Sequence, residues 1–124
     1  MNLELAWAAG FWDGEGSCSL VRSRGVPRWA RLYISQKYYE QPIQRFHNAV
    51  GQQGRLTQRI RPNTTNIGTV YAWTAVKQST VIEVMKLLWP YLCDAKKEQY
   101  LKCKNEQDRL TEERKGWRSR HITA

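Results

Sequence analysis

The sequence predicts an α+β domain in which helices cover one face of a four-stranded antiparallel sheet. Two observations lead to this fold class. Apolar residues recur at helical spacing in several segments, and between these segments lie pairs of short alternating stretches joined by turn-forming residues. The resulting order is αββαββα, with a further charged helix at the end. A chain of 124 residues can bury one hydrophobic core but is too short for two.

The first helix and hairpin are expected in the N-terminal third of the chain. Residues 3–13 carry apolar and small side chains at helical spacing, and the run stops at Gly14 and Gly16. Residues 17–24 and 28–36 alternate between apolar and polar side chains, and a Gly-Val-Pro turn separates them. This stretch therefore predicts one helix followed by a β-hairpin.

A second unit of the same kind follows, and then two more helices. Residues 40–50 have the spacing of a helix. Residues 55–61 and 70–76 alternate as strands across a turn-rich stretch. Residues 79–92 carry an apolar helical face, and residues 96–113 predict a charged helix.

The domain organisation expected from this pattern is a single domain over residues 1–113 with a basic tail over residues 114–124. The tail contains several arginines and a lysine around one tryptophan, without a clear hydrophobic period.

The composition favours a polyanionic partner. Lysine and arginine number 20 against 11 acidic residues, which gives a formal net charge of +9. Such a field attracts nucleic acid, although ribosomal, membrane-surface and heparin-binding proteins share the same property.

The cysteines and the N-terminus indicate an intracellular, soluble protein. The chain has 3 cysteines, an odd number, with no CxxC spacing, so neither disulfides nor structural zinc are expected. The first residues include an acid and no basic lead-in, and no apolar run approaches the roughly 20 residues of a membrane span.

Strand alternation places one set of side chains on the face of the sheet that the helices leave bare. Residues 16–39 and 54–61 contain several basic residues and no acid, whereas a solvated face usually mixes charges of both signs. Binding of DNA or RNA is therefore favoured over an ordinary solvated face. Arg22 falls on the core side unless the first strand bulges there. The side chains expected to contact DNA are Ser19, Val21, Ser23, Arg24, Arg28, Trp29, Arg31, Tyr33, Arg55, Thr57, Arg59, Arg61 and Thr74, with Lys97 outside the sheet.

Residues 5–17 read Leu-Ala-Trp-Ala-Ala-Gly-Phe-Trp-Asp-Gly-Glu-Gly-Ser and resemble the motif of the LAGLIDADG homing endonucleases. Residues 34–37 (Ile-Ser-Gln-Lys), 89–92 (Trp-Pro-Tyr-Leu) and 96–99 (Lys-Lys-Glu-Gln) resemble further landmarks of that family. The likeness covers residues 3–102. It implies an αββαββα fold with a saddle-shaped DNA-binding sheet. It also implies Mg²⁺-dependent cleavage of both strands of a long pseudo-palindromic DNA target, in the service of intron or intein mobility in a phage, organelle or microbial genome.

The resemblance implies a metal centre at the end of the motif. Glu15 and the Gly14 carbonyl would hold Mg²⁺, and Asp13 would hold the helix end in place. Glutamate at position 15 departs from the aspartate in the motif's name, but it keeps the carboxylate chemistry with one more methylene of reach.

Two further residues have roles by the same resemblance. Gln36 is similar to a polar residue near the catalytic water, and Lys96 to a basic residue near the cleaved phosphate. The loop before Lys96 leaves the spacing open by one residue, so Lys97 is the alternative lysine. Either residue could instead be a simple phosphate contact.

Small residues on the first helix predict close packing of two helices. Ala6, Ala9, Gly10 and Asp13 form a face on which no long side chain holds two backbones apart. One motif per chain then requires a homodimer through the helix at residues 3–13. The alternative is that this face packs within its own domain.

Two other functions are compatible with the same fold. One is an RNA-binding intron splicing factor (a maturase), which would not need Glu15. The other is a DNA-binding regulator that has lost cleavage, against which the presence of Glu15, Gln36 and Lys96 argues.

Overall fold

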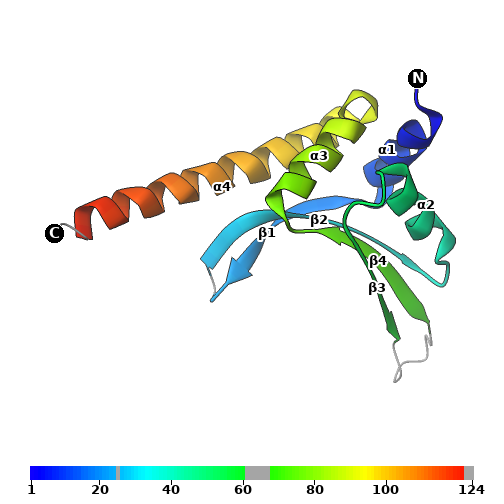
Figure 1. Ribbon diagram of the computed structural model, residues 1–124, viewed down its shortest axis with the longest axis horizontal. Helices are drawn as coiled ribbons and strands as arrows, with labels where there is room; N and C mark the ends of the chain where they lie inside the picture. The colour runs from blue at the N-terminus through cyan, green and yellow to red at the C-terminus, as the bar shows by residue number, and fades with distance from the viewer. Residues whose placement is uncertain (25, 61–67, 122–124) are drawn as a thin grey trace.

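The computed structural model describes residues 1–24, 26–60 and 68–121 as a bent sheet with helices on one side (Figure 1). The strand order is β1-β2-β4-β3, and all neighbouring strands are antiparallel. The predicted α+β class and the αββαββα order are confirmed. In chain order the elements are α1 (Leu3–Glu15), β1 (Ser17–Ser23), β2 (Val26–Lys37), α2 (Gln41–Ala49), β3 (Arg55–Ile60), β4 (Thr69–Ala75), α3 (Gln78–Leu88), the 3₁₀ turn η1 (Trp89–Tyr91) and α4 (Asp94–His121).

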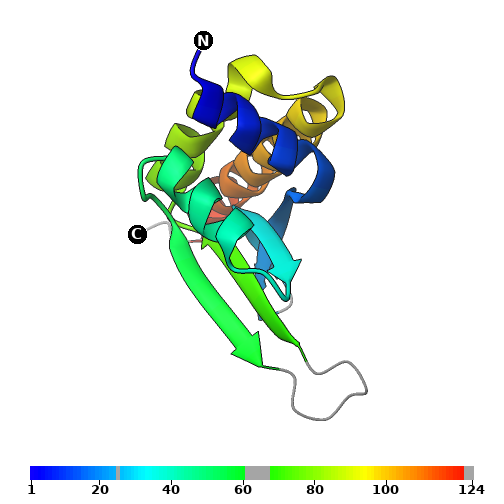
Figure 2. The same ribbon diagram turned by 90° about the vertical axis from the view of Figure 1, so that its right-hand side faces the viewer.

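The helices all lie on one face of the sheet, and the opposite face is bare (Figures 1 and 2). Both hairpins bend away from the helices, so that the bare face is concave (Figure 1). We call this bare concave side the outer face. Every residue of β3 is exposed, since the β3–β4 hairpin extends beyond the helical layer.

The hydrophobic core lies between the sheet and the helices. Ala30, Leu32 and Ile34 on β2 are each 0% exposed, whereas Trp29 and Arg31, on either side of Ala30, are exposed. The alternation predicted for this strand is therefore confirmed, because successive side chains of a strand point to opposite faces.

Three aromatic rings join the first two helices to the sheet. The Trp12 ring stacks on Phe46 with centroids 5.8 Å apart, and Trp73 meets Phe46 edge-on at 4.8 Å. The Trp73 indole N–H donates a hydrogen bond of 2.8 Å to the Gln53 carbonyl. Because all three rings are buried, they fix α1 and α2 on β4.

Gly54 gives a test of this packing. Its φ is +87°, and a Cβ there would overlap the immobilised Trp73 ring. We expect Gly54→Ala to lower the free energy of unfolding by about 3 kcal/mol, measured by urea denaturation. Gly51→Ala is the control: φ there is +73°, but a Cβ would make only an ordinary contact of 3.9 Å with Gln53 Nε2, so the loss should be about 1 kcal/mol. Equal losses of unfolding free energy in the two variants would show that overlap with the Trp73 ring adds nothing to the destabilisation.

Side chains of α4 satisfy backbone groups of the sheet. The N–H of Cys18 on the edge strand β1 donates to Gln99 Oε1 at 3.2 Å, and the Cys103 thiol donates to the Cys18 carbonyl at 3.2 Å. The N–H of Ala30 donates to Gln107 Oε1 at 3.3 Å. Because unpaired backbone groups of a strand need partners, α4 both covers and terminates this side of the sheet.

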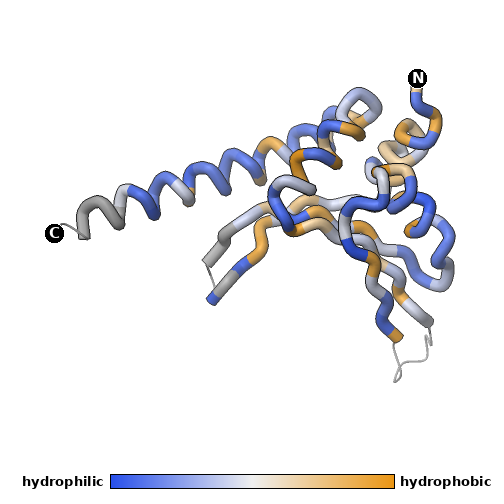
Figure 3. The backbone as a smooth tube through the Cα atoms, in the orientation of Figure 1, coloured by the Kyte–Doolittle hydropathy of each residue, from blue (hydrophilic) through white to orange (hydrophobic). Residues whose placement is uncertain are grey.

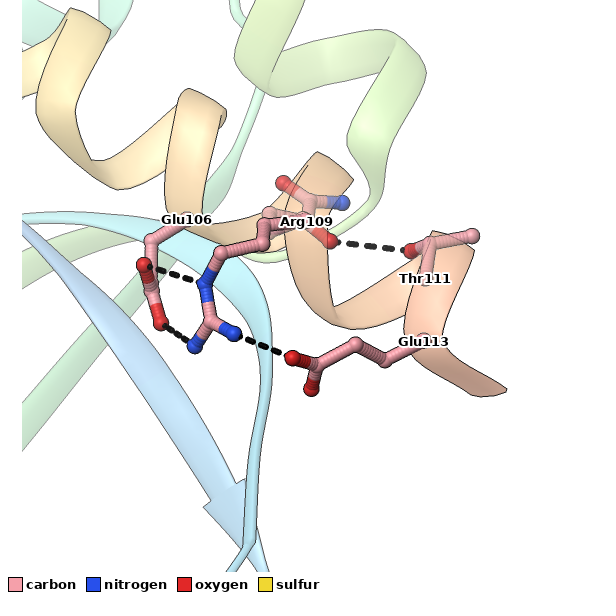
Figure 4. Close-up of polar contacts among 5 residues, drawn as sticks. Glu106, Arg109, Thr111 and Glu113 are labelled. Carbon is pink, nitrogen blue, oxygen red and sulfur yellow. Dashed lines mark hydrogen bonds and ion pairs between the residues drawn. The ribbon is translucent and has the colours of Figure 1, made fainter. Parts of the chain in front are cut away.

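Residues 114–121 of the predicted basic tail form the last part of α4, which continues to His121, and residues 122–124 lie outside the described residues. The exposed part of α4 is hydrophilic (Figure 3). Ion pairs between its side chains, and not the packing of an apolar face, stabilise this part of the helix. Arg109 binds both Glu106 and Glu113 (Figure 4). No helix in the described ranges, α4 included, is long and apolar enough to cross a membrane.

The first hairpin contains the irregularity on which the facing of Arg22 depended. The register between β1 and β2 shifts between Val21 and Arg22. Regular alternation therefore stops there, and it fixes the facing of β1 side chains only from Ser17 to Val21.

Candidate functional site

The carboxylates of the motif lie at the C-terminal end of α1 and differ in their surroundings. The Asp13 carboxylate accepts a hydrogen bond of 3.1 Å from the backbone N–H of Cys93, just before α4. Glu15, the last residue of α1, is exposed, and so is Gly14. Asp13 thus ties two helices together, whereas Glu15 faces solvent.

The two candidate lysines lie on different sides of α4. Lys96 Nζ donates a hydrogen bond of 2.5 Å to the carbonyl of Gly16, the residue after Glu15. Lys97 Nζ lies over the Trp89 ring, 5.5 Å from its centroid, in the helical layer. Lys96 is therefore the lysine beside the motif, and Lys97 is placed away from the outer face on which DNA contacts were expected.

Gln36 lies near the end of β2, opposite Tyr71 of β4. It follows Ile34 in the alternation and therefore shares the helix-facing side of the strand. In the part of the chain that the structure describes, no hydrogen bond joins Gln36 to Glu15 or Lys96. Its predicted role near the reacting water remains a proposal.

The exposed stripe of α1 differs in one member from the predicted small-residue face. Ala9 is 0% exposed and belongs to the core beside Ala8 and Trp12, because successive helical residues rotate by about 100°. Gly10 and Gly14 are exposed, and a Cβ at either would meet nothing within 4 Å. The open stripe of α1 therefore includes Gly10 and Gly14 at a four-residue spacing.

Strand pairing aligns the remaining predicted side chains in rows across the outer face. Tyr33, Thr74 and Arg55 are paired in one row across three strands. Arg31, Arg55 and Arg59 are all exposed on these strands, and Arg24 is exposed in the turn that follows β1. The other aligned residues are Ser19 opposite Arg31, Val21 opposite Trp29, and Thr57 and Arg59 along β3.

Three predicted contacts are not located at the side-chain level. Arg61 lies outside the described residues. The backbones of Ser23 and Arg28 belong to β1 and β2, but their side chains are outside the description.

The charges of the chain are separated between its two faces. No strand contains an aspartate or glutamate. Leaving Arg22 aside, each ion pair among the described residues joins two helical side chains. The cations of the strands therefore lack acidic neighbours in the sheet, which leaves the outer face attractive to a polyanion.

The sequence analysis did not identify some residues of this surface. Lys37 shares the parity of the outer-face residues and pairs with Val70, beside Arg59 of the next strand. Alternation could have found it. Lys77 and Thr80 lie beside Arg31 and Arg55 at the rim of the outer face, but they belong to the start of α3, so strand periodicity does not reach them.

A single chain offers part of a metal-binding site. Among the described residues, no cluster of three or more His, Cys, Asp or Glu could hold a metal ion. Glu15 and the Gly14 carbonyl provide oxygen donors, which suit a hard divalent cation. The C-terminal end of α1 adds partial negative charge, because the last helical carbonyls lack intrahelical partners. The residues present thus fit a divalent cation whose remaining donors come from other molecules.

Cys18, which follows the motif closely in the sequence, is poorly suited to metal binding. Burial raises the pKa of the Cys18 thiol well above its usual range, and the neighbouring Cys103 raises it further. Cys18 is therefore protonated near neutral pH, and carboxylate and carbonyl oxygens remain the relevant donors.

No protein-family model and no curated protein sequence matches the chain. Among solved structures, it is similar to the homing endonuclease I-CvuI in complex with DNA, with a TM-score of 0.56 and 18% identity over 82% of this chain and 64% of that one. The LAGLIDADG meganuclease I-CpaMI bound to uncleaved DNA gives a TM-score of 0.63 and 17% identity over 90% of this chain and 37% of that one.

The group I intron-encoded homing endonuclease I-CeuI, complexed with DNA, gives a TM-score of 0.57 and 13% identity over 98% of this chain and 59% of that one. The chain thus spans 64% of the length of I-CvuI and less of the other two. The TM-scores and the high coverage of this chain show that it has the fold of the LAGLIDADG homing endonucleases, although the sequence identity is low.

Proposed function

We propose that the protein is a site-specific, Mg²⁺-dependent DNA endonuclease that cuts both strands of a long pseudo-palindromic target as a homodimer. The observation that carries this proposal is the exposed Glu15 carboxylate at the end of α1, next to Lys96. A sheet without acidic residues supplies a DNA-binding surface in the same molecule. The structural neighbours are DNA complexes of homing endonucleases, which supports the same reaction here.

A second copy of the chain completes the proposed site. The chain matches only 37% of I-CpaMI, so a single copy corresponds to part of that protein. Packing the open Gly10 and Gly14 stripe of α1 against its counterpart would bring two Glu15 carboxylates together. Because two such carboxylates repel each other, a divalent cation between them would stabilise the arrangement.

The roles of the residues follow from this arrangement. Glu15 and the Gly14 carbonyl hold the cation. When bound, Mg²⁺ supplies the positive charge that activates a water molecule and stabilises the leaving oxygen. Lys96 contacts the phosphate being cut, and Gln36 orients the attacking water. Asp13 keeps the end of α1 fixed through its bond to the Cys93 N–H.

The test is cleavage of a randomised duplex DNA library in Mg²⁺, followed by sequencing of the cut ends, with Ca²⁺ in parallel. Symmetric cuts at one motif that require Mg²⁺ would support the proposal and reveal the target. Selective binding without cutting would indicate a DNA-binding regulator instead. Neither binding nor cutting of DNA would turn attention to structured RNA and the maturase function.

The outer face is expected to read bases through Arg59. This exposed residue lies next to the end of β3, and arginine forms paired hydrogen bonds to guanine in the major groove. We expect Arg59→Ala to reduce discrimination about tenfold at one symmetric pair of target positions, measured by sequencing bound DNA after selection. Arg109→Ala on α4 is the control and should leave base preference unchanged. A uniform loss of affinity across all sequences would contradict base reading by Arg59.

A further inference from the structure

A hollow of 440 Å³ lies where β4 ends and α3 begins, at the rim of the outer face. Three cations from different elements line it: Arg31 from β2, Arg55 from the start of β3, and Lys77 directly before α3. Thr74 and Thr80 also line it, and none of its lining residues is acidic. Such a concentration of positive charge in one hollow is suited to an anion.

None of the three cations, Arg31, Arg55 and Lys77, forms an ion pair with an acidic side chain of the described residues. The Arg31 guanidinium lies over the Tyr33 ring, 5.6 Å from its centroid. The hollow therefore keeps its charge available for a ligand.

The start of α3 adds to the positive electrostatic potential of the hollow. Lys77 is the N-cap residue, and its side chain makes no capping hydrogen bond, so the first backbone N–H groups of the helix lack a side-chain acceptor. The Gln78 amide donates to the carbonyls of Ala30 at 2.9 Å and Val76 at 2.8 Å. These bonds hold the start of α3 against β2 and fix the position of Lys77.

We propose that this hollow binds one backbone phosphate of duplex DNA and thereby sets the position of the sheet along the groove. The row of Tyr33, Thr74 and Arg55 makes the hollow continuous with the outer face, so that DNA on that face reaches it. A phosphodiester carries the compact negative charge that three converging cations favour, whereas base edges do not. This inference rests on the proposed DNA-binding function.

The experiment compares Lys77→Gln with Lys86→Gln, which removes the same charge from an exposed site on α3 outside the hollow. Binding to a mixed-sequence duplex is measured over a range of salt concentrations. Loss of one phosphate contact should reduce the slope of log K against log salt by about 0.9, and the affinity by about eightfold near 0.1 M salt. Lys86→Gln should keep the slope of the unmodified protein.

Each result is decisive. If Lys77→Gln and Lys86→Gln have the same slope while the unmodified protein binds DNA, the hollow does not hold a phosphate and only this inference fails. A loss of affinity in Lys77→Gln that is confined to particular DNA sequences would also overturn the inference, because a phosphate contact carries no sequence information. If the unmodified protein binds no duplex DNA at all, the proposed function and the inference fail together.

Discussion

Replacing Glu15 with glutamine is expected to abolish DNA cleavage while leaving DNA binding nearly unchanged. The carboxylate is exposed at the end of α1 and makes no ion pair within the described residues, so its loss should not disturb the fold. Removal of the charged metal ligand should lower the cleavage rate by roughly three orders of magnitude or more.

The measurement is single-turnover cleavage of the target in Mg²⁺, together with binding of the same duplex in Ca²⁺. Glu98→Gln is the matched control, since Glu98 is exposed on α4 and forms no ion pair with another residue that the structure describes; its cleavage rate should be unchanged. Equal losses of binding and cleavage in Glu15→Gln would show that Glu15 contributes to DNA binding or folding and is not a metal ligand.

The strand faces could be predicted from the sequence because one side of the sheet is buried. Ala30, Leu32 and Ile34 must all face the helices, and that requirement fixes Arg31 and Tyr33 on the opposite side. The same reasoning fails beyond Val21, where the register shifts. Burial of one face specifies the alternation only as far as regular pairing continues.

Helical features were harder to predict than strand faces. The end of α4 lacks an apolar period, and its ion pairs, such as Arg109 with Glu106, are not visible as hydrophobic spacing. The choice between Lys96 and Lys97 depended on where α4 begins. One residue changes the direction of a helical side chain by about 100°, so only the structure could place Lys96 beside Gly16 and Lys97 over Trp89.

The rim of the outer face could not be predicted, because it combines segments that are distant in the sequence. Arg31, Arg55 and Lys77 come from two strands and a helix start, and they meet only in the folded sheet. Sequence periodicity finds side chains that share a face of one element. It does not find a site between elements, and the site at Glu15 became predictable only through its resemblance to a known motif.

Gly10→Leu is expected to convert the proposed dimer into a monomer without unfolding the chain. A Cβ at Gly10 meets nothing within 4 Å in the single chain, and leucine favours helix by almost 1 kcal/mol over glycine. Within a pair of closely packed α1 helices, however, the same side chain would hold the two backbones apart. The mass in solution, measured by light scattering, should therefore halve. The helical content, measured by circular dichroism, should stay unchanged.

The control places a leucine on another exposed helical surface, through Glu83→Leu on α3. This variant should keep the dimer mass, since it adds apolar surface without touching α1. Cleavage should fall with dimerisation in Gly10→Leu, because one chain supplies a single Glu15 carboxylate and too few metal ligands of its own. An unchanged mass for Gly10→Leu at the same concentration would rule out association through this stripe. Full cleavage activity in a monomeric variant would show instead that one chain completes the metal site without a partner.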